Sequence, residues 1–194
     1  MPPAKPSRPA PLEGVPPGFR VERDLSVGRH PLLAAFPGLD RLDTARRHEP
    51  DEAARERLHH QTLVEVVSQD VWMYVAPRAL PKGMRRAWRP VVSPDADCIV
   101  VGQEHLRESP ELTLFLDIFH ELCHIRQRAA GRELWPEDLS YVERPTEVEA
   151  YRFVVDEAHR YGVADAILRD YLRVEWIDDD EHRTLLDAVG VARR

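Results

Sequence analysis

The sequence predicts an α+β domain in which a small mixed or antiparallel sheet packs on a buried helix and the C-terminal half is helical. Two observations support this class. Short β-branched runs lie in the first half of the chain, whereas helical patterns dominate from Ser109 to the end. With 194 residues, of which 43% are hydrophobic, the chain can also bury one sizeable core. We therefore expect a single domain over residues 19–194, preceded by a tail at residues 1–18.

Strands are expected in short segments of the first half. Residues 71–76 and 97–102 are apolar runs rich in β-branched side chains. Residues 88–92 are expected to pair with residues 97–102 as a hairpin that turns at Ser93-Pro94-Asp95. A helical pattern at residues 51–67 precedes these strands.

The strongest helix signal follows the strands. Ser109 and Pro110 suit an N-cap and a first helical position, and apolar residues then recur almost all round the helix as far as Ile125. Gly131 closes this segment. A helix that is apolar on nearly every side is buried rather than exposed on the surface.

Two later segments also predict helices. Residues 146–161 end before Gly162, and the acidic run at residues 178–181 suits the start of a last helix that ends near Gly190. A calcium loop would need more ligands at alternating positions than this acidic run offers.

The N-terminus and the cysteines indicate the cellular compartment. Seven of residues 1–18 are proline, and no apolar run follows Met1 as it would in a signal peptide, so we expect an extended, disordered tail. No stretch approaches the roughly 18 to 20 apolar residues of a membrane span. Cys98 and Cys123 fall in a predicted strand and a predicted helix, which suits a reducing compartment. The sequence therefore predicts a cytoplasmic protein that is not bound to a membrane.

The charge of the chain argues against a nucleic-acid partner. Its net charge is −7, whereas phosphate binding needs a surplus of Lys and Arg on one face. Arg46-Arg47 and Arg85-Arg86 are short and separated, which is typical of solvated surface. His59 and His60 are adjacent and would point about 100° apart on a helix, so they are not expected to form a metal site.

The buried helix contains the pentapeptide His120-Glu121-Leu122-Cys123-His124. Residues four apart lie one above the other in a helix, so both imidazoles can reach a single ion. Glu121 then lies where a metal-bound water would need a base. Buried histidines without partners would be destabilising, which favours a bound metal. The pattern predicts the core of a zinc hydrolase; the alternative is a pair of core histidines satisfied by hydrogen bonds.

A catalytic zinc site needs a third protein ligand and leaves its fourth position to water. Glu147 heads an apolar stripe at the start of the next helix, whereas Glu149 lies on a polar side of it. Thr146 and Glu149 also have the spacing of a capping box. We therefore expect Glu147 to be the ligand, with Glu149 and then Glu143 as alternatives. The remaining alternative is that these glutamates form a solvated acidic helix start and bind no metal.

Two histidines from one helix and a glutamate from the next resemble the gluzincin branch of the zincin metallopeptidases. More narrowly, Glu147, Ala150 and Phe153 after the histidine pair are similar to the ImmA/IrrE-like intracellular metallopeptidases, whose third-ligand helix carries Glu, Ala and Phe at this spacing. The resemblance covers about residues 97–160. It implies a compact zincin-like domain with the sheet packed on the metal-binding helix.

The chain departs from that family at a few positions. Tyr151 stands where the family usually has Asn or Asp, Val154 where it has Ala, and Arg126 where zincins generally have an apolar residue. Cys123 is also unusual inside the pentapeptide, and we expect a buried thiol that fills space rather than a ligand. Arg126 and Cys123 motivate a second hypothesis, in which the chain is a non-catalytic zincin-fold binding or regulatory protein with a vestigial or purely structural metal site.

The resemblance implies an intracellular zinc endopeptidase that acts on a peptide or protein substrate. Zn²⁺ on His120, His124 and Glu147 would lower the pKa of its bound water to about 7. Glu121 would accept the proton of that water as general base and later protonate the leaving amine.

The same resemblance implies groups around the reacting carbonyl. Tyr141, Tyr151 and His159 are candidates for the donor to the oxyanion, and Tyr151 lies one turn after Glu147, although it could equally be a core aromatic. Asp117 is a possible partner that fixes an imidazole tautomer, or it is solvated. In zincins the strand before the metal helix pairs with an extended peptide, so residues 97–102 are expected to hold substrate unless they form an ordinary internal strand.

Overall fold

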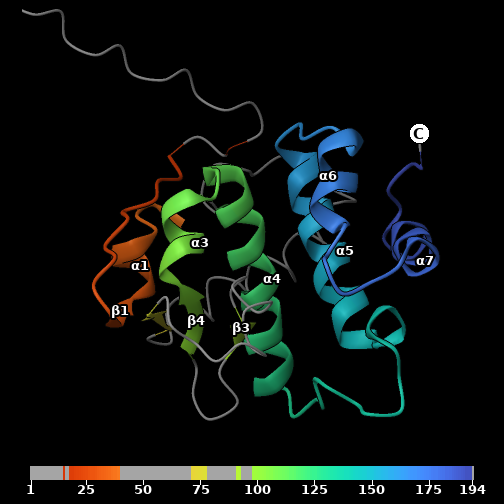
Figure 1. Cartoon of the computed structure of the whole chain (residues 1–194), viewed down its shortest axis with the longest axis horizontal. Helices are drawn as coiled ribbons and strands as arrows, with labels where there is room; N and C mark the ends of the chain where they lie inside the picture. Colours follow the sequence, from red (N-terminus) through yellow and green to blue (C-terminus); the bar gives the residue numbers. More distant parts are fainter. Residues whose placement is uncertain (1–14, 16–17, 40–70, 78–90, 93–97, 194) are drawn as a thin grey trace, which may run out of the picture.

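The computed structural model describes residues 15, 18–39, 71–77, 91–92 and 98–193. Strands precede most of the helices along these residues, which confirms the predicted α+β class. In chain order the elements are β1 Gly28–Pro31, α1 Leu32–Ala35, β2 Trp72–Ala76, β3 Val91–Val92, β4 Cys98–Gly102, α3 Gln103–Glu108, α4 Glu111–Ala129, η2 Tyr141–Glu143, α5 Pro145–Arg160, α6 Asp165–Leu172 and α7 Asp179–Val189 (Figure 1).

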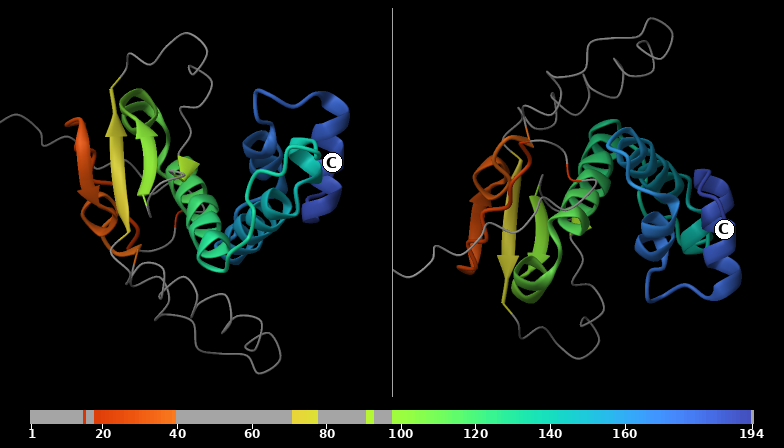
Figure 2. Two further views of the ribbon diagram at one scale, coloured as in Figure 1. Left: turned by 90° about the horizontal axis from the view of Figure 1, so that it is seen from below. Right: turned by 90° about the horizontal axis from the view of Figure 1, so that it is seen from above.

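A four-stranded mixed sheet forms one side of the molecule, with strand order β1-β2-β4-β3. β1 is antiparallel to β2, and β2 is parallel to β4. β3 is antiparallel to β4, with Val91 opposite Val100 and Val92 opposite Ile99, so the predicted pairing of these two segments is confirmed. The predicted turn at residues 93–95 lies outside the described residues. Figure 2 shows the sheet on one side of α4 and helices α5, α6 and α7 on the other.

β4 has a neighbouring strand on each side, β2 on one and β3 on the other. It is therefore an internal strand, which is the alternative left open above. Ile99 and Val100 already lie opposite β3. The expectation that residues 97–102 pair with a substrate is therefore wrong for this part of the strand. A strand can add a peptide only along an edge whose main-chain groups are not paired.

Helix α4 is the centre of the core. Its 19 residues are buried on almost every side, as its apolar sequence predicts. The helix begins at Glu111 with Pro110 as its N-cap, one residue later than predicted. Ser109 instead ends the short helix α3, where its backbone N–H donates to the carbonyl of His105.

The helices that follow α4 pack around the C-terminal side of the core. Helix α5 begins at Pro145, one residue before the predicted start. The predicted capping box of Thr146 and Glu149 is wrong, because the Thr146 hydroxyl donates to the carbonyl of Leu134 instead. Helix α7 is capped as predicted: Asp178 accepts hydrogen bonds from the first turn, and Gly190 ends the helix in the left-handed conformation with φ of 79°.

Several predictions fall on residues that the structure does not describe. These are the helix at residues 51–67 with its two histidines, both arginine pairs, and most of the predicted tail. Of residues 1–18 only Val15 and Gly18 are described, and Val15 packs against the core. Among the described residues, no helix has the length and apolar character needed to cross a membrane.

Candidate metal centre

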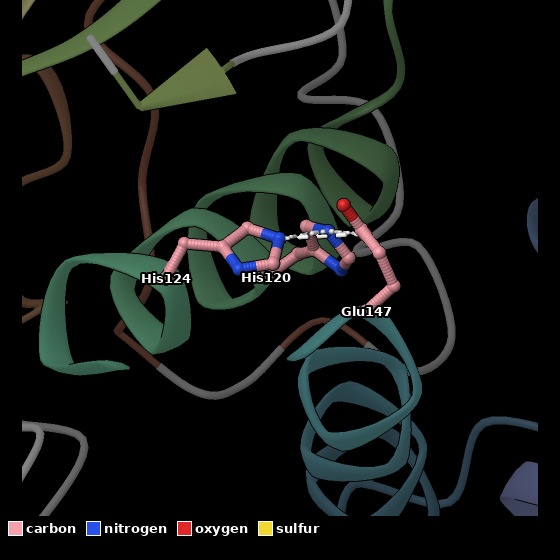
Figure 3. A group of neighbouring side chains, drawn as sticks. All are labelled: His120, His124 and Glu147. Atoms are coloured by element: carbon pink, nitrogen blue, oxygen red, sulfur yellow. Dashed lines mark hydrogen bonds and ion pairs between the residues drawn. The ribbon is translucent and has the colours of Figure 1, made fainter. Parts of the chain in front are cut away.

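Three buried side chains from two helices converge on one point between α4 and α5. His120 and His124 project from α4, and Glu147 projects from the first turn of α5 (Figure 3). The Nε2 atoms of the two histidines lie 2.9 Å apart, and Glu147 Oε2 lies 3.3 Å from His120 Nε2 and 3.4 Å from His124 Nε2. The structure thus brings together the three residues predicted as ligands.

The spacing of these atoms suits a tetrahedral metal ion. Two ligand atoms that each lie about 2.0 to 2.1 Å from a tetrahedral zinc ion are roughly 3.3 Å apart, close to the observed separations. Glu147 Oε2 is a buried oxygen without a hydrogen-bond partner among the described residues, although it faces both imidazoles. An oxygen in this position is stabilised by a cation. Within the described ranges, no other group of three His, Cys, Asp or Glu side chains brings its ligand atoms so close together.

Electrostatic coupling between these residues favours positive charge at the centre. Burial opposes ionisation of Glu147, but the two imidazoles outweigh it and hold the pKa of this carboxyl well below its usual range. Burial also opposes a charge on His124, yet Glu147, Glu121 and Gln127 together raise the pKa of His124 to about 9. Burial and the neighbouring His124 lower the pKa of His120. One anionic ligand and one neutral imidazole are therefore ready to bind a cation, and the second imidazole must lose a proton to join them.

Glu121, the predicted general base, is also buried, with 5% of its surface exposed. Its negative charge contributes to the raised pKa of His124, which places the carboxylate within electrostatic range of the ligand group. The site therefore contains a second carboxylate that is not one of the three candidate ligands.

The predicted residue Tyr151 lies against the site. Its ring centroid is 4.3 Å from that of His120, and its hydroxyl is 2.8 Å from the hydroxyl of Tyr141 in η2. Burial, Tyr151 and the negative charges of Glu147 and Glu121 raise the pKa of Tyr141 well above its usual range. His159, the third candidate donor, is instead paired with Asp165 at 2.6 Å near the other end of α5. Of the three predicted donors, the two tyrosines therefore lie at this site and His159 does not.

The two alternative glutamates have partners of their own. Glu149 binds the guanidinium of Arg126 at 2.9 Å and that of Arg132 at a shorter distance. Glu143 accepts hydrogen bonds from the hydroxyl and the backbone N–H of Ser140 at the start of η2. Neither belongs to the ligand group, so the structure favours Glu147.

Asp117 differs from its predicted role, whereas Cys123 agrees with its prediction. The carboxylate of Asp117 is bonded to neither candidate imidazole: it lies 2.7 Å from His105 Nε2 and accepts a hydrogen bond from the Tyr171 hydroxyl at 3.1 Å. Cys123 is buried, and burial raises the pKa of its thiol to about 12. A thiol with so high a pKa is a poor metal ligand, in agreement with the expectation that Cys123 fills space in the core.

The sequence reasoning missed Gln127, which contacts His124 from the next turn of α4. Its Oε1 lies 2.8 Å from His124 Nδ1. The signal that could have identified Gln127 is its spacing of three residues from His124, which places the two side chains on the same side of a helix. Polar residues at this spacing are common, so the spacing alone does not identify a partner.

We compared the chain with models of protein families, with curated proteins and with solved structures, and none of the three comparisons gives a match. Any function must therefore be argued from the site itself.

Proposed function

We propose that this chain is a zinc-dependent peptidase in which His120, His124 and Glu147 hold Zn²⁺ and Glu121 is the general base. The observation that carries the proposal is the convergence of three buried ligand atoms at separations suited to a tetrahedral ion. Two imidazoles and one carboxylate form a ligand set that zinc hydrolases use. The order of these residues along the chain, and their origin in two successive helices, also resembles the gluzincins.

A zinc ion at this position would supply a bound water with a pKa near 7 and would polarise the carbonyl of a substrate. Glu121 then accepts the proton of the attacking water and returns it to the leaving amine. Peptide hydrolysis needs both transfers, because the water must become a better nucleophile and the amine a better leaving group. A single buried carboxylate beside the ligands can make both transfers in turn.

The paired tyrosines supply a hydrogen bond to the oxyanion. The two hydroxyls lie 2.8 Å apart, the Tyr151 ring packs against His120, and a phenolic hydroxyl at this position can donate to a substrate oxygen. The raised pKa of Tyr141 keeps its hydroxyl protonated at neutral pH. A preorganised donor of this kind stabilises the transition state more than the bound substrate.

The departures that motivate a non-catalytic alternative have structural roles in this chain. Arg126 binds Glu149, and Cys123 is packed in the core. Because neither residue obstructs the ligand group, we favour the enzyme over the binding protein. The proposal includes the zincin-like fold and a cytoplasmic location, where the buried free thiols of Cys98 and Cys123 would stay reduced.

The test is a comparison of the wild type with Glu121→Gln. Both proteins should bind one equivalent of zinc, since Glu121 is not a ligand. The wild type should cleave peptides from a proteome-derived library, and the variant should be slower by at least about 100-fold because it lacks the base. Equal cleavage by both proteins would remove the mechanism. Stoichiometric zinc without any cleavage would favour the non-catalytic alternative.

A further inference from the structure

Gln127 connects the two helices that carry the candidate ligands. Its side chain is 1% exposed. The amide oxygen lies 2.8 Å from His124 Nδ1, and the amide nitrogen lies 3.0 Å from the carbonyl oxygen of Thr146 and 3.0 Å from Glu149 Oε2. One side chain on α4 thus contacts a candidate ligand and also the first turn of α5, which carries Glu147.

The partners of Gln127 determine the direction of each hydrogen bond. The Thr146 carbonyl and the ionised Glu149 carboxylate can only accept, so both must receive protons from the amide nitrogen. The amide oxygen can only accept, so the Nδ1 atom of His124 must carry the proton in their shared bond. When His124 is neutral, its lone pair is therefore on Nε2, the atom that faces Glu147 and His120.

The hydrogen-bond partner of Gln127 at Glu149 is itself held by ion pairs. Glu149, which anchors the amide of Gln127, is held by the guanidinium groups of Arg126 and Arg132. The guanidinium of Arg126 also lies 5.7 Å from the centre of the Phe153 ring. Gln127 is consequently bonded to groups that have little freedom to turn.

The other candidate imidazole has no comparable support. His120 Nδ1 is buried and has no hydrogen-bond partner among the described residues. Its ring is instead packed against Tyr151. Of the two candidate imidazoles, only that of His124 has its orientation set by a hydrogen bond from its second ring nitrogen to another described residue.

We propose that Gln127 is the positioning residue of the metal centre: it holds His124 with the proton on Nδ1 and Nε2 toward the ion, and it fixes the position of α4 relative to the start of α5. Such partners orient a metal-bound imidazole and increase its basicity. The inference rests on the metal site of the proposed function, but it does not require that the protein cleaves peptides.

The test measures zinc affinity by competition with a chromophoric chelator, together with long-range ¹H–¹⁵N NMR spectra of the zinc-loaded protein. Gln127→Met keeps the approximate volume but removes every hydrogen bond of the amide. We expect zinc to bind about 10- to 100-fold more weakly to this variant. In the wild type, His124 should be metallated at Nε2 and show a slowly exchanging Nδ1 proton, and this proton should exchange rapidly in the variant.

An exchange of two groups separates positioning from a general loss of structure. In the double variant Gln127→Glu with Glu149→Gln, a carboxylate at 127 can accept the His124 proton and an amide at 149 can donate to that carboxylate, while the Thr146 carbonyl loses its donor. Because the bonds to His124 and to position 149 return but the bond to Thr146 does not, we expect the double variant to recover part of the zinc affinity that Gln127→Met loses. The matched control is Gln103→Met, which removes an amide that donates to the Leu25 carbonyl at 2.6 Å. Gln103 lies on α3, which carries none of the candidate ligands, so this variant should leave zinc affinity unchanged.

The proposal is overturned if Gln127→Met binds zinc as tightly as the wild type, or if the zinc-loaded wild type carries the His124 proton on Nε2. A wild type that binds no zinc would overturn both this inference and the proposed function. Zinc binding that depends on Gln127 but is not accompanied by peptide cleavage would leave this inference standing and contradict only the proposed activity.

Discussion

Glu147 Oε2 lies 3.3 Å from His120 Nε2, although the two buried side chains belong to different helices. Their approach depends on the packing of α5 against α4, in which the rings of Phe119 and Phe153 stack with centroids 5.9 Å apart. Apolar contacts between rigid helices therefore bring the polar atoms together. A site built on helices holds its geometry better than one built on loops, so the ligands are arranged before any ion binds.

Glu147→Gln should weaken zinc binding by more than about 100-fold, because it replaces the anionic ligand with a neutral amide. Competition with a chromophoric chelator measures the effect. Glu143→Gln is the matched control, since Glu143 bonds only Ser140 in the described structure and lies outside the ligand group. If the control loses zinc and Glu147→Gln retains it, the third ligand has been assigned to the wrong residue.

Tyr141→Phe and Tyr151→Phe should each lower kcat by roughly 10- to 1,000-fold and leave zinc content unchanged, because each removes one hydroxyl of the oxyanion donor pair. The double variant should be little slower than either single variant, since the hydroxyls act as a unit. Tyr74→Phe is the control, because Tyr74 lies on β2 and is 36% exposed. The donor role would be lost if the double variant kept wild-type kcat on a peptide that the wild type cleaves.

The candidate ligands could be predicted from sequence because their placement depends mainly on helical periodicity. A spacing of four residues places His120 above His124, and the apolar stripe of the next helix places Glu147 rather than Glu149 toward the core. Both arguments need only the period of an α-helix. The same reasoning could not identify the partner of Asp117, because His105 lies on the short helix α3, which the sequence pattern did not indicate.

The failed predictions depend on contacts between distant segments. Glu149 does not cap its helix, because Arg126 on α4 and Arg132 after it bind its carboxylate. Strand β1, Gly28–Pro31, contains no β-branched residue, and it is a strand because it pairs with β2. The ion pairs of Glu149 and the strand pairing of β1 both depend on tertiary packing, which local sequence patterns do not encode.

Asp178→Ala should lower the free energy of unfolding by about 1 kcal/mol, because it removes the N-cap of α7. Asp178 accepts hydrogen bonds from the backbone N–H groups of Asp180 and Glu181, both at 2.9 Å. Urea denaturation measures the change. Asp187→Ala on the same helix should change stability by less than about 0.5 kcal/mol, because its ion pair with Arg193 is largely exposed. Equal effects of the two substitutions would contradict the capping role.

Zinc affinity should increase with pH, because zinc must displace a proton from His124. Burial alone would lower the pKa of His124, but its carboxylate neighbours and Gln127 raise it to about 9. Between about pH 7 and pH 9 we expect affinity to increase by up to about tenfold per pH unit, with one proton released per zinc ion bound. Calorimetric titration in buffers of different ionisation enthalpy counts that proton. Affinity that stays constant across this range would show that His124 is already neutral before zinc binds.

The same proton should make the stability of the metal-free protein depend on pH. The pKa of His124 is raised in the folded state from its ordinary value of 6.5 to about 9. Its contribution to the free energy of unfolding is therefore complete below pH 6.5 and is lost as the pH increases through 9. We expect the metal-free protein to lose on the order of 1 to 3 kcal/mol across this window. His124→Gln should flatten the pH profile measured by urea denaturation, and a variant profile as steep as that of the wild type would assign the effect to another group.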